Sequence, residues 1–594
     1  MIKVKKIILP AVLILCLIGL VIFTGRFGRS PETVLSENAA LASRESLDVA
    51  NQLFRDTEKA WRNKSTKDIE LIDNSSIAHS SGIQISDNYI RISSPGIYRL
   101  KGSLTEGQVS VDCKGNVALI LDDVNVTNSS DAAISVTDAE HLLIYLPDGS
   151  QSNISSGKQR EIISSNANKD VDYASGAAIY SKDNLSIAGS GKLSVSGYIN
   201  NGIATTDHLI IISGDIDISA VNNGLKGNDL VSILNGNISI LSGGDGIQSD
   251  RDLSISGGKL DITAGDTSTV SLEESDGHRG QRAMADGNMQ QQFQRFEGEP
   301  PADLVRPDEN FVNPGGDFSS PGGDKPQNSV PNNRKDIPRN PLSDSEKDIP
   351  RNNIQGIGKD ESQSNQISST STKGIKSAGN LTINGGTITI EAADDGIHTD
   401  EILTVSGGDI NITKSKEGLE GNQINIEGGK ISVVASDDGM NASGGNLPVL
   451  RISGGTIYVN ANGDGLDSNG DLVIEGGSTI VDGPSNNGNG ALDSGSENGG
   501  TIVCNAGTIL AIGASGMAET FNSDSAQYSF IKNFSEMFTK ETQISIYDEN
   551  EKIIFEHISA KSFNSVVFSS PDLIPGHTYT ISVGDKTETV TINK

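Results

Sequence analysis

Carboxylates recur directly before a series of regularly spaced glycines. Some are doubled, as in Asp394-Asp395 and Asp437-Asp438. If the repeats stack about 5 Å apart, these carboxylates repel one another unless cations lie between them. Ca²⁺ suits such a site because it binds about six to eight oxygen ligands in irregular geometry, although Asp and Asn also favour turns that hold no metal. The predicted Ca²⁺ ligands are Asp245, Asp250, Asp394, Asp395, Asp400, Glu417, Asp437, Asp438, Asp464 and Asp467.

Basic residues occupy a second position, two residues after the same glycines. Lys226, Lys376 and His398 stand there, and we expect them to line a polar groove, facing outward. They are predicted to contact the carboxylates of an acidic glycan, with Ca²⁺ bridging the rest; ordinary solvated side chains would give the same pattern. A lyase would need a Lys or Arg base beside a cation, for which Lys226, Lys373 and Lys376 are candidates. No segment brings a Lys, an Arg and a metal site together, so no catalytic residue is predicted.

Repeats of about 22 residues position these side chains. The repeats contain short runs in which inward Ile, Leu and Val alternate with outward Ser, Thr, Asn and Asp, as in LTINGGTITI. A period near 22 with about three short strands per repeat is typical of a parallel β-helix. Glycines at the corners are expected to supply positive φ angles. The anchor glycines, which define the repeats, are Gly202, Gly224, Gly246, Gly374, Gly396, Gly418, Gly439 and Gly465.

The composition agrees with an all-β chain. The 594 residues include 67 Gly but only 14 Phe, 10 Tyr and 1 Trp, which indicates many short strands and tight turns. The net charge of −31 argues against nucleic-acid binding, because neutralising phosphates needs a basic face. Cys113 and Cys504 lie in strand-like runs and are predicted to be buried free thiols. The histidines lack the spacing of zinc ligands.

The two ends of the chain differ from the repeats. Residues 1–29 contain lysines followed by an apolar run of 17 residues, the pattern of a signal peptide or a signal anchor. Residues 30–70 are predicted to be a helical or loose lead-in. Residues 527–594 alternate apolar and polar side chains, which predicts a small antiparallel β cap.

One long segment interrupts the repeats. The β-helix is predicted to occupy residues 71–266 and 372–526. Between them, residues 267–371 hold ten of the 18 prolines, duplicate the sequence KDIPRN and have no strand pattern. Low apolar content with many prolines predicts disorder, so this segment is interpreted as a disordered Pro/Gly-rich insertion.

Several segments together carry a family resemblance. DGIQSD, KGIKSAGNLTINGG, DDGIHTD and GDGLDSNGDLVIEGG occur in this order, and SFNSVVFSSPDLIPGHTYTISVG lies near the C-terminus. Over about residues 70–590, without the insertion, the chain resembles bacterial calcium-dependent carbohydrate-binding β-helix proteins. The resemblance implies a right-handed, pectate-lyase-like parallel β-helix with bound Ca²⁺, which binds plant-type polysaccharides such as pectin and cellulose. It assigns Ca²⁺ to Asp245, Asp394, Asp395, Asp437, Asp438 and Asp464, and the chain departs from it at Asn201, Asn223 and Lys373.

The expected function is that of an extracellular or cell-surface, calcium-binding polysaccharide-binding protein without catalysis. Acidic glycans such as polygalacturonate are the expected partners, and cellulose is a further candidate. Two alternatives stay open: a calcium-dependent polysaccharide lyase that acts by β-elimination, and a structural adhesion solenoid in which Ca²⁺ only stiffens the repeats. The N-terminal segment is the one part expected to contact a membrane, as a transmembrane anchor if it is not cleaved.

Overall fold

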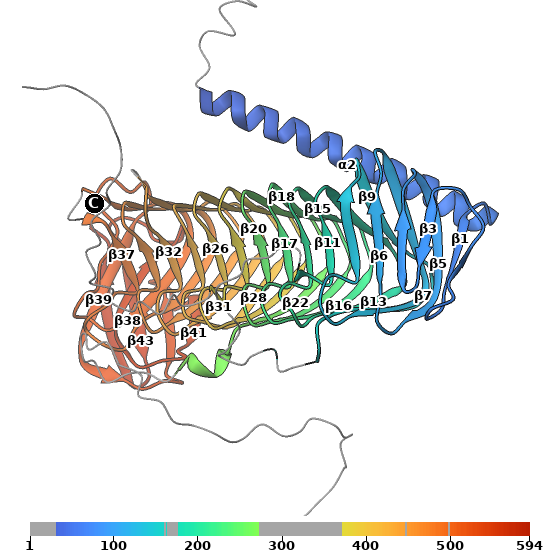
Figure 1. Ribbon diagram of the computed structural model, residues 1–594. Helices are drawn as coiled ribbons and strands as arrows, with labels where there is room; N and C mark the ends of the chain where they lie inside the picture. Colours follow the sequence, from blue (N-terminus) through green and yellow to red (C-terminus); the bar gives the residue numbers. More distant parts are fainter. Residues whose placement is uncertain are drawn as a thin grey trace, which may run out of the picture. The chain divides into compact units, whose positions relative to one another are not determined.

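The described residues form a stack of parallel β-strands (Figure 1). The computed structural model describes residues 31–159, 162, 176–272, 371–445, 448–496 and 499–593, which all lie in one compact unit. The stack has about 13 turns of about 23 residues, which confirms the predicted parallel β-helix. The predicted signal or anchor segment lies outside the described residues, and so do residues 273–370 of the insertion.

Each central turn contributes one strand to each of three faces. The first face consists of three-residue strands, and in most of them the middle residue is the least buried. Its strands are β11 (Ile179–Ser181), β14 (Ile203–Thr205), β17 (Leu225–Gly227), β20 (Ile247–Ser249), β23 (Ile375–Ser377), β26 (Ile397–Thr399), β29 (Leu419–Gly421), β32 (Met440–Ala442), β35 (Leu466–Ser468) and β37 (Leu492–Ser494).

The second face follows in each turn. Its strands are β12 (Asn184–Gly189), β15 (His208–Ile211), β18 (Leu230–Ile233), β21 (Asp252–Ile255), β24 (Leu381–Ile383), β27 (Ile402–Val405), β30 (Gln423–Ile426) and β33 (Val449–Ile452). At the C-terminal end, β36 (Asp471–Asp482) and β38 (Ile502–Gly513) run through both the second and the third face.

The third face consists mostly of six-residue strands that alternate exposed and buried residues, as β22 does. Because neighbouring side chains of a strand point to opposite sides, this alternation places Ile and Leu inside the stack and polar side chains outside. Its strands are β13 (Lys192–Gly197), β16 (Asp215–Ala220), β19 (Asn237–Ser242), β22 (Lys259–Ala264), β25 (Thr387–Ala392), β28 (Asp409–Ser415), β31 (Lys430–Ala435) and β34 (Thr456–Ala461).

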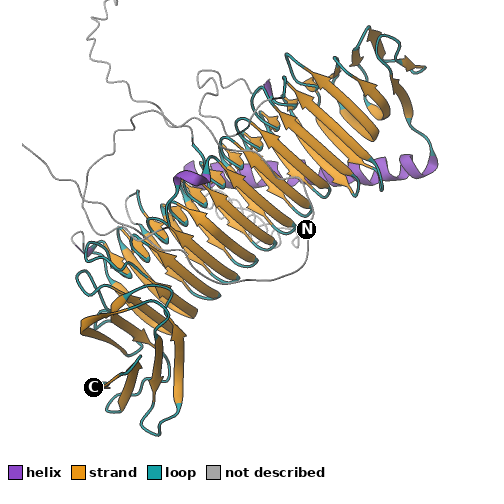
Figure 2. Ribbon diagram, turned by 90° about the horizontal axis from the view of Figure 1, so that it is seen from below, coloured by secondary structure: helices purple, strands orange, loops and turns teal. Residues whose placement is uncertain are grey.

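A long helix covers the N-terminal part of the second face (Figure 2). Helix α2 (Pro31–Asn63) packs Leu53 against Leu143, Tyr145 and Ala188. No helix in the part of the chain that the structure describes is long and apolar enough to cross a membrane.

The first turns of the stack contain ten strands: β1 (Lys67–Leu71), β2 (Ile77–Ala78), β3 (Ile83–Ser86), β4 (Tyr89–Ile92), β5 (Gly96–Leu104), β6 (Gln108–Asp112), β7 (Asn116–Asn128), β8 (Ile134–Asp138), β9 (His141–Leu146) and β10 (Gln151–Ser156).

Antiparallel strands close the C-terminal end, as predicted. β42 (Phe563–Ser569) pairs with both β38 and β39 (Ser529–Phe538). A separate four-stranded sheet contains β40 (Gln543–Tyr547), β41 (Ile553–Ile558), β43 (Thr578–Val583) and β44 (Lys586–Thr591). Pairing of β38 with β42 covers an edge that would otherwise be open to another chain.

The predicted positive φ angles occur at one set of corner glycines, whereas the anchor glycines at another corner are needed for space. A Cβ atom on Gly224 would lie 2.4 Å from Ile240 Cγ2 and 2.7 Å from the carbonyl oxygen of Gly246 in the next turn. Positive φ angles occur instead between the second and third faces, for example at Gly236 (φ 132°). The stack therefore requires glycine at these two corners for different reasons.

Stacking continues directly across the insertion. Ile247 of β20 pairs with Ile375 of β23, and Lys259 of β22 pairs with Thr387 of β25. The described part of residues 267–371 begins with a short 3₁₀ helix, η2 (Thr267–Thr269).

Both cysteines of the described chain, Cys113 and Cys504, are buried free thiols, as predicted.

Candidate functional site

Two rows of side chains run along the first face and its leading corner. The corner row consists of the residue directly before each anchor glycine, and the face row of the residue two after it. The face row runs through Lys226, Gln248, Lys376, His398, Glu420, Asn441 and Asp467, each paired with the next. The corner row runs through Asn201, Asn223, Asp245, Lys373, Asp395, Glu417, Asp438 and Asp464.

The first members of the corner row accept hydrogen bonds from the backbone of the next turn. Asn201 Oδ1 accepts from Asn223 N at 3.1 Å, and Asn223 Oδ1 accepts from Asp245 N at 2.9 Å. Asp245, which is 1 % exposed, accepts from Lys373 N at 2.8 Å and from Ser371 Oγ at 2.7 Å. Because an amide oxygen serves here as well as a carboxylate does, these positions have a structural role that needs no metal.

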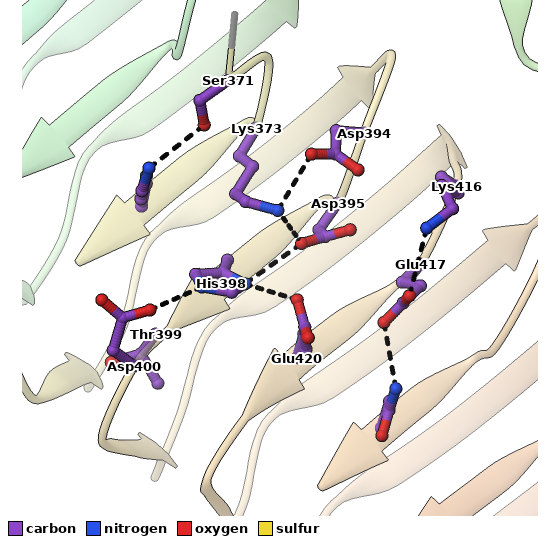
Figure 3. A network of polar contacts seen from close by, with 12 residues as sticks. Ser371, Lys373, Asp394, Asp395, His398, Thr399, Asp400, Lys416, Glu417 and Glu420 are labelled. Carbon is purple, nitrogen blue, oxygen red and sulfur yellow. Dashed lines mark hydrogen bonds and ion pairs between the residues drawn. The ribbon is translucent and has the colours of Figure 1, made fainter. Parts of the chain in front are cut away.

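An ion-pair network surrounds His398 (Figure 3). Its Nδ1 lies 3.1 Å from Asp395 Oδ2 and 2.5 Å from Glu420 Oε2, and its Nε2 lies 2.9 Å from Asp400 Oδ1. Burial disfavours the charged imidazole, but the hydrogen bonds to Asp395 and Glu420 outweigh it and raise the pKa of His398 to about 10. The hydrogen bond to His398 lowers the pKa of Glu420 to about 2. Both ring nitrogens are therefore protonated at neutral pH.

Lys373 supplies a second cation to this network. Its Nζ donates to Asp395 and lies 3.0 Å from Asp394 Oδ2. Burial opposes the charge on Lys373, but Asp395 and Asp394 raise its pKa above the usual value. A lysine with a raised pKa is a poorer base than an ordinary lysine, because it holds its proton at neutral pH. The ammonium lies between carboxylates, where a metal ion would otherwise be needed.

A different arrangement occurs farther along the two rows. Asp438, Asp464 and Asp467, hereafter the acidic cluster, each offer an oxygen within 4.8 Å of the others. Burial and the charge of Asp437 raise the pKa of Asp438 to about 8, and burial raises that of Asp464 to about 6. Within the described residues neither Asp438 nor Asp464 forms an ion pair. Asp438 and Asp464 therefore lack internal cations such as those that neutralise the His398 network.

The donor set of the acidic cluster fits Ca²⁺. All of its ligand atoms are oxygens, which Ca²⁺ prefers. Asn441, the neighbour of Asp467 in the face row, has a buried Oδ1 that accepts no hydrogen bond, while its Nδ2 donates to Glu417 Oε2 at 3.2 Å.

The remaining predicted residues are dispersed. Lys226 is buried at 7 % exposure, with its Nζ 3.8 Å from Asp250 Oδ2, instead of facing outward as predicted. Lys376 Nζ donates to Ser371 Oγ at 3.2 Å. Glu417 lies 3.4 Å from Lys416 Nζ and accepts a hydrogen bond from Asn441. The three predicted glycan contacts, Lys226, Lys376 and His398, are thus all engaged by groups of the protein itself.

One cluster was missed by the sequence interpretation. Asp207, His208 and Asp229 offer ligand atoms within 4.8 Å of one another at the corner between the first and second faces. The sequence could have indicated this cluster, because Asp207 and Asp229 are 22 residues apart and therefore occupy the same position in successive repeats. Arg251 Nε lies 3.4 Å from Asp229 and supplies a cation there.

The fold and the site define a parallel β-solenoid with polar and charged rows along one face. A model of the family described as carbohydrate-binding domain-containing proteins matches residues 86–418. The chain belongs to this family.

Two known proteins are similar over parts of the chain. A carbohydrate-binding domain-containing protein of Acetivibrio thermocellus is 35 % identical over 141 residues, which are 23 % of this chain. The match spans 48 %, about half, of that relative. A solved structure, the gadolinium derivative of the polysaccharide lyase-like protein from C. thermocellum, is 23 % identical with a TM-score of 0.31. That match covers 62 % of this chain and 93 % of the other.

Proposed function

We propose that this protein binds an acidic polysaccharide outside the cell, with Ca²⁺ held at the acidic cluster as the link between them. Membership of a carbohydrate-binding family supports the class of partner. The observation that carries the proposal is the acidic cluster itself, where Asp438 and Asp464 have raised pKa values and no ion-pair partner among the described residues.

The net charge explains why the cation is required. A chain of net charge −31 repels a polyuronate, so direct contact between the two anions is unfavourable. The ion would be held by Asp438, Asp464 and Asp467. Bound Ca²⁺ supplies a positive charge with coordination positions left over for carboxylates of the glycan.

Location at the cell surface is part of the proposal. The basic and apolar residues at the N-terminus have the pattern of an export signal or a membrane anchor. Extracellular modules bind Ca²⁺ with dissociation constants of about 10⁻⁴ to 10⁻³ M, which a cluster of few ligands can achieve.

Binding to polygalacturonate tests the proposal. Titration calorimetry should detect binding in the presence of Ca²⁺, and EDTA and added salt should each weaken it. Asp438→Asn should weaken binding about tenfold or more. The matched control is Asp261→Asn, which changes an exposed carboxylate on the third face and should leave binding unaltered.

Three outcomes separate the alternatives. Binding that persists unchanged in EDTA and in Asp438→Asn would refute a calcium link at the acidic cluster. A calcium-dependent rise in melting temperature without glycan binding would mean that the ion serves the solenoid alone. Release of unsaturated uronates, detected by ultraviolet absorbance, would show that the protein is a lyase.

A further inference from the structure

A groove lies on the third face, away from the two rows. It has a volume of about 410 Å³ and crosses β25, β28, β31 and β34. Thr389, Asn411, Ser432 and Tyr458 form its floor, one residue from each of these successive strands. Because strands of neighbouring turns are about 4.8 Å apart, the floor extends along about 14 Å of the stack.

Three of the four floor residues have polar groups without a partner among the described residues. In the described structure, the side chains of Thr389, Asn411 and Ser432 make no hydrogen bond. At the N-terminal end of the same column, two polar side chains bond to each other. Asn153 Nδ2 donates to Asn125 Oδ1 at 2.6 Å.

Other polar and charged side chains of the third face pair with one another. Lys192 Nζ lies 2.6 Å from Asp217 Oδ2, and Asn237 Nδ2 donates to Asp215 Oδ1 at 2.7 Å. In the groove, the hydroxyl and amide groups of Thr389, Asn411 and Ser432 stay available to a ligand. Exposed hydroxyl and amide groups in a concave surface are what recognises a hydroxyl-rich ligand.

Tyr458 provides a fixed aromatic ring at one end of the groove. Its hydroxyl donates to Asp482 Oδ2 at 2.8 Å, and Asp482 is fully buried. His557 Nε2, from β41 of the C-terminal sheet, lies 2.8 Å from the other oxygen of Asp482. An aromatic ring combines an apolar face with a polar edge, so a held ring can pack against the C–H face of a sugar at little entropic cost.

The groove carries no net charge. Its charged lining residues are Asp409 and Lys430, whose Oδ2 and Nζ atoms are 3.7 Å apart. They neutralise each other, so the groove has neither the excess cations that attract a polyuronate nor the unpaired carboxylates that attract Ca²⁺. The electrostatics favour a neutral ligand.

We propose that the groove of the third face binds a neutral glycan chain, lying along the stack of turns, without Ca²⁺. Thr389, Asn411 and Ser432 bond to its hydroxyl groups, and Tyr458 packs against a pyranose ring. This second site rests on the proposed carbohydrate-binding function, but it differs from the acidic cluster in position, charge and metal requirement.

Calorimetry with cellohexaose, xylohexaose and mannohexaose in EDTA tests the second site. At least one of these hexasaccharides should bind. Tyr458→Ala should weaken that binding about tenfold, the effect of losing a packed aromatic contact. Tyr458→Phe keeps the ring and should stay within about threefold of the wild type, and the double variant Thr389→Ala, Ser432→Ala should weaken binding without disturbing Asp482.

Controls separate this inference from the proposed function. Thr404→Ala, on the second face, should bind the hexasaccharide like the wild type. Calcium-dependent binding of polygalacturonate should survive Tyr458→Ala. If none of the three hexasaccharides binds, or if binding is unchanged in Tyr458→Ala and in the double variant, the second site is refuted, while intact polygalacturonate binding would leave the proposed function standing.

Discussion

Replacing Asp438 by Asn should make the metal-free protein more stable at pH 8. Asp438 has a pKa of about 8 in the folded chain against 3.8 for an ordinary aspartate, because burial and the neighbouring carboxylates disfavour its charge. Since a tenfold change in an equilibrium constant is worth about 1.4 kcal/mol, ionising Asp438 costs about 6 kcal/mol more in the folded chain than in the unfolded one.

The sign of the pH dependence follows from the raised pKa. A carboxyl group with a higher pKa in the folded state stabilises the fold fully below its unfolded value, and this contribution is lost as the pH rises through the folded value. Without metal, stability should therefore fall by a few kcal/mol between about pH 4 and pH 8. Ca²⁺ should offset the loss, and its effect should be larger at pH 8 than at pH 5.

Asparagine is the suitable replacement because it preserves the local hydrogen bond. Asp438 Oδ1 accepts from Asp464 N at 2.6 Å, and an amide oxygen can do the same. In EDTA at pH 8 the variant should gain a few kcal/mol over the wild type, and the difference should be much smaller at pH 5. At about a hundredfold excess of Ca²⁺ over its dissociation constant, the wild type should gain about 2.7 kcal/mol and the variant much less.

Urea unfolding at pH 5 and pH 8, with Ca²⁺ or with EDTA, measures all of these differences. Asp261→Asn is the control, because Asp261 is exposed and forms no ion pair within the described residues. If Asp438→Asn is less stable than the wild type in EDTA at pH 8, the carboxylates of the acidic cluster do not repel one another as argued. If the variant keeps the whole response to Ca²⁺, the ion binds elsewhere.

Three further changes test other parts of the structure. Lys373→Ala leaves Asp395 buried without its ammonium partner and should cost about 3–5 kcal/mol in urea unfolding, while Ca²⁺ should restore part of the loss. Gly224→Ala places a Cβ atom 2.4 Å from Ile240 Cγ2 and should cost about 1–3 kcal/mol, measured in the same way. Deletion of residues 273–370 should change the melting temperature by only a few degrees in a calorimetric scan, because the strands on either side of the insertion already pair directly.

Each of these three has a result that contradicts it. A Lys373→Ala variant as stable as the wild type would mean that His398 compensates the charge of Asp395 without Lys373. Gly488→Ala, in an exposed turn, serves as the control for Gly224→Ala, and equal losses in the two would argue against crowding at the anchor glycine. Failure of the deletion variant to fold would show that the insertion takes part in the solenoid.

Much of the fold could be predicted because a solenoid is nearly one-dimensional. Each turn contacts mainly the turns before and after it, so a repeat of about 22 residues specifies which side chains become neighbours. The alternation in segments such as LTINGGTITI likewise specifies which side chains are inside. The alignment of Lys376 with His398 followed from these two patterns alone.

The state of the charges could not be read from the same patterns. Asp395 and Asp438 occupy one row and look equivalent in the sequence, yet Lys373 and His398 neutralise Asp395, whereas no ion pair to Asp438 occurs within the described residues. The difference depends on how far a side chain reaches and on how deeply it is buried. Lys226 likewise is buried, although its place in the repeat predicted an outward side chain.

The sequence by itself determined the parallel solenoid, its period and the membership of each row, because these depend only on spacing and on the alternation of apolar residues. The tertiary structure alone decided which carboxylates remain without a cation and where the polar side chains of the third face lack partners, as they do at Asn411. Ion pairing and burial depend on which side chains from different turns meet, and therefore on the rotamers that these side chains adopt. A repeat pattern specifies the register of the turns but not these side-chain contacts.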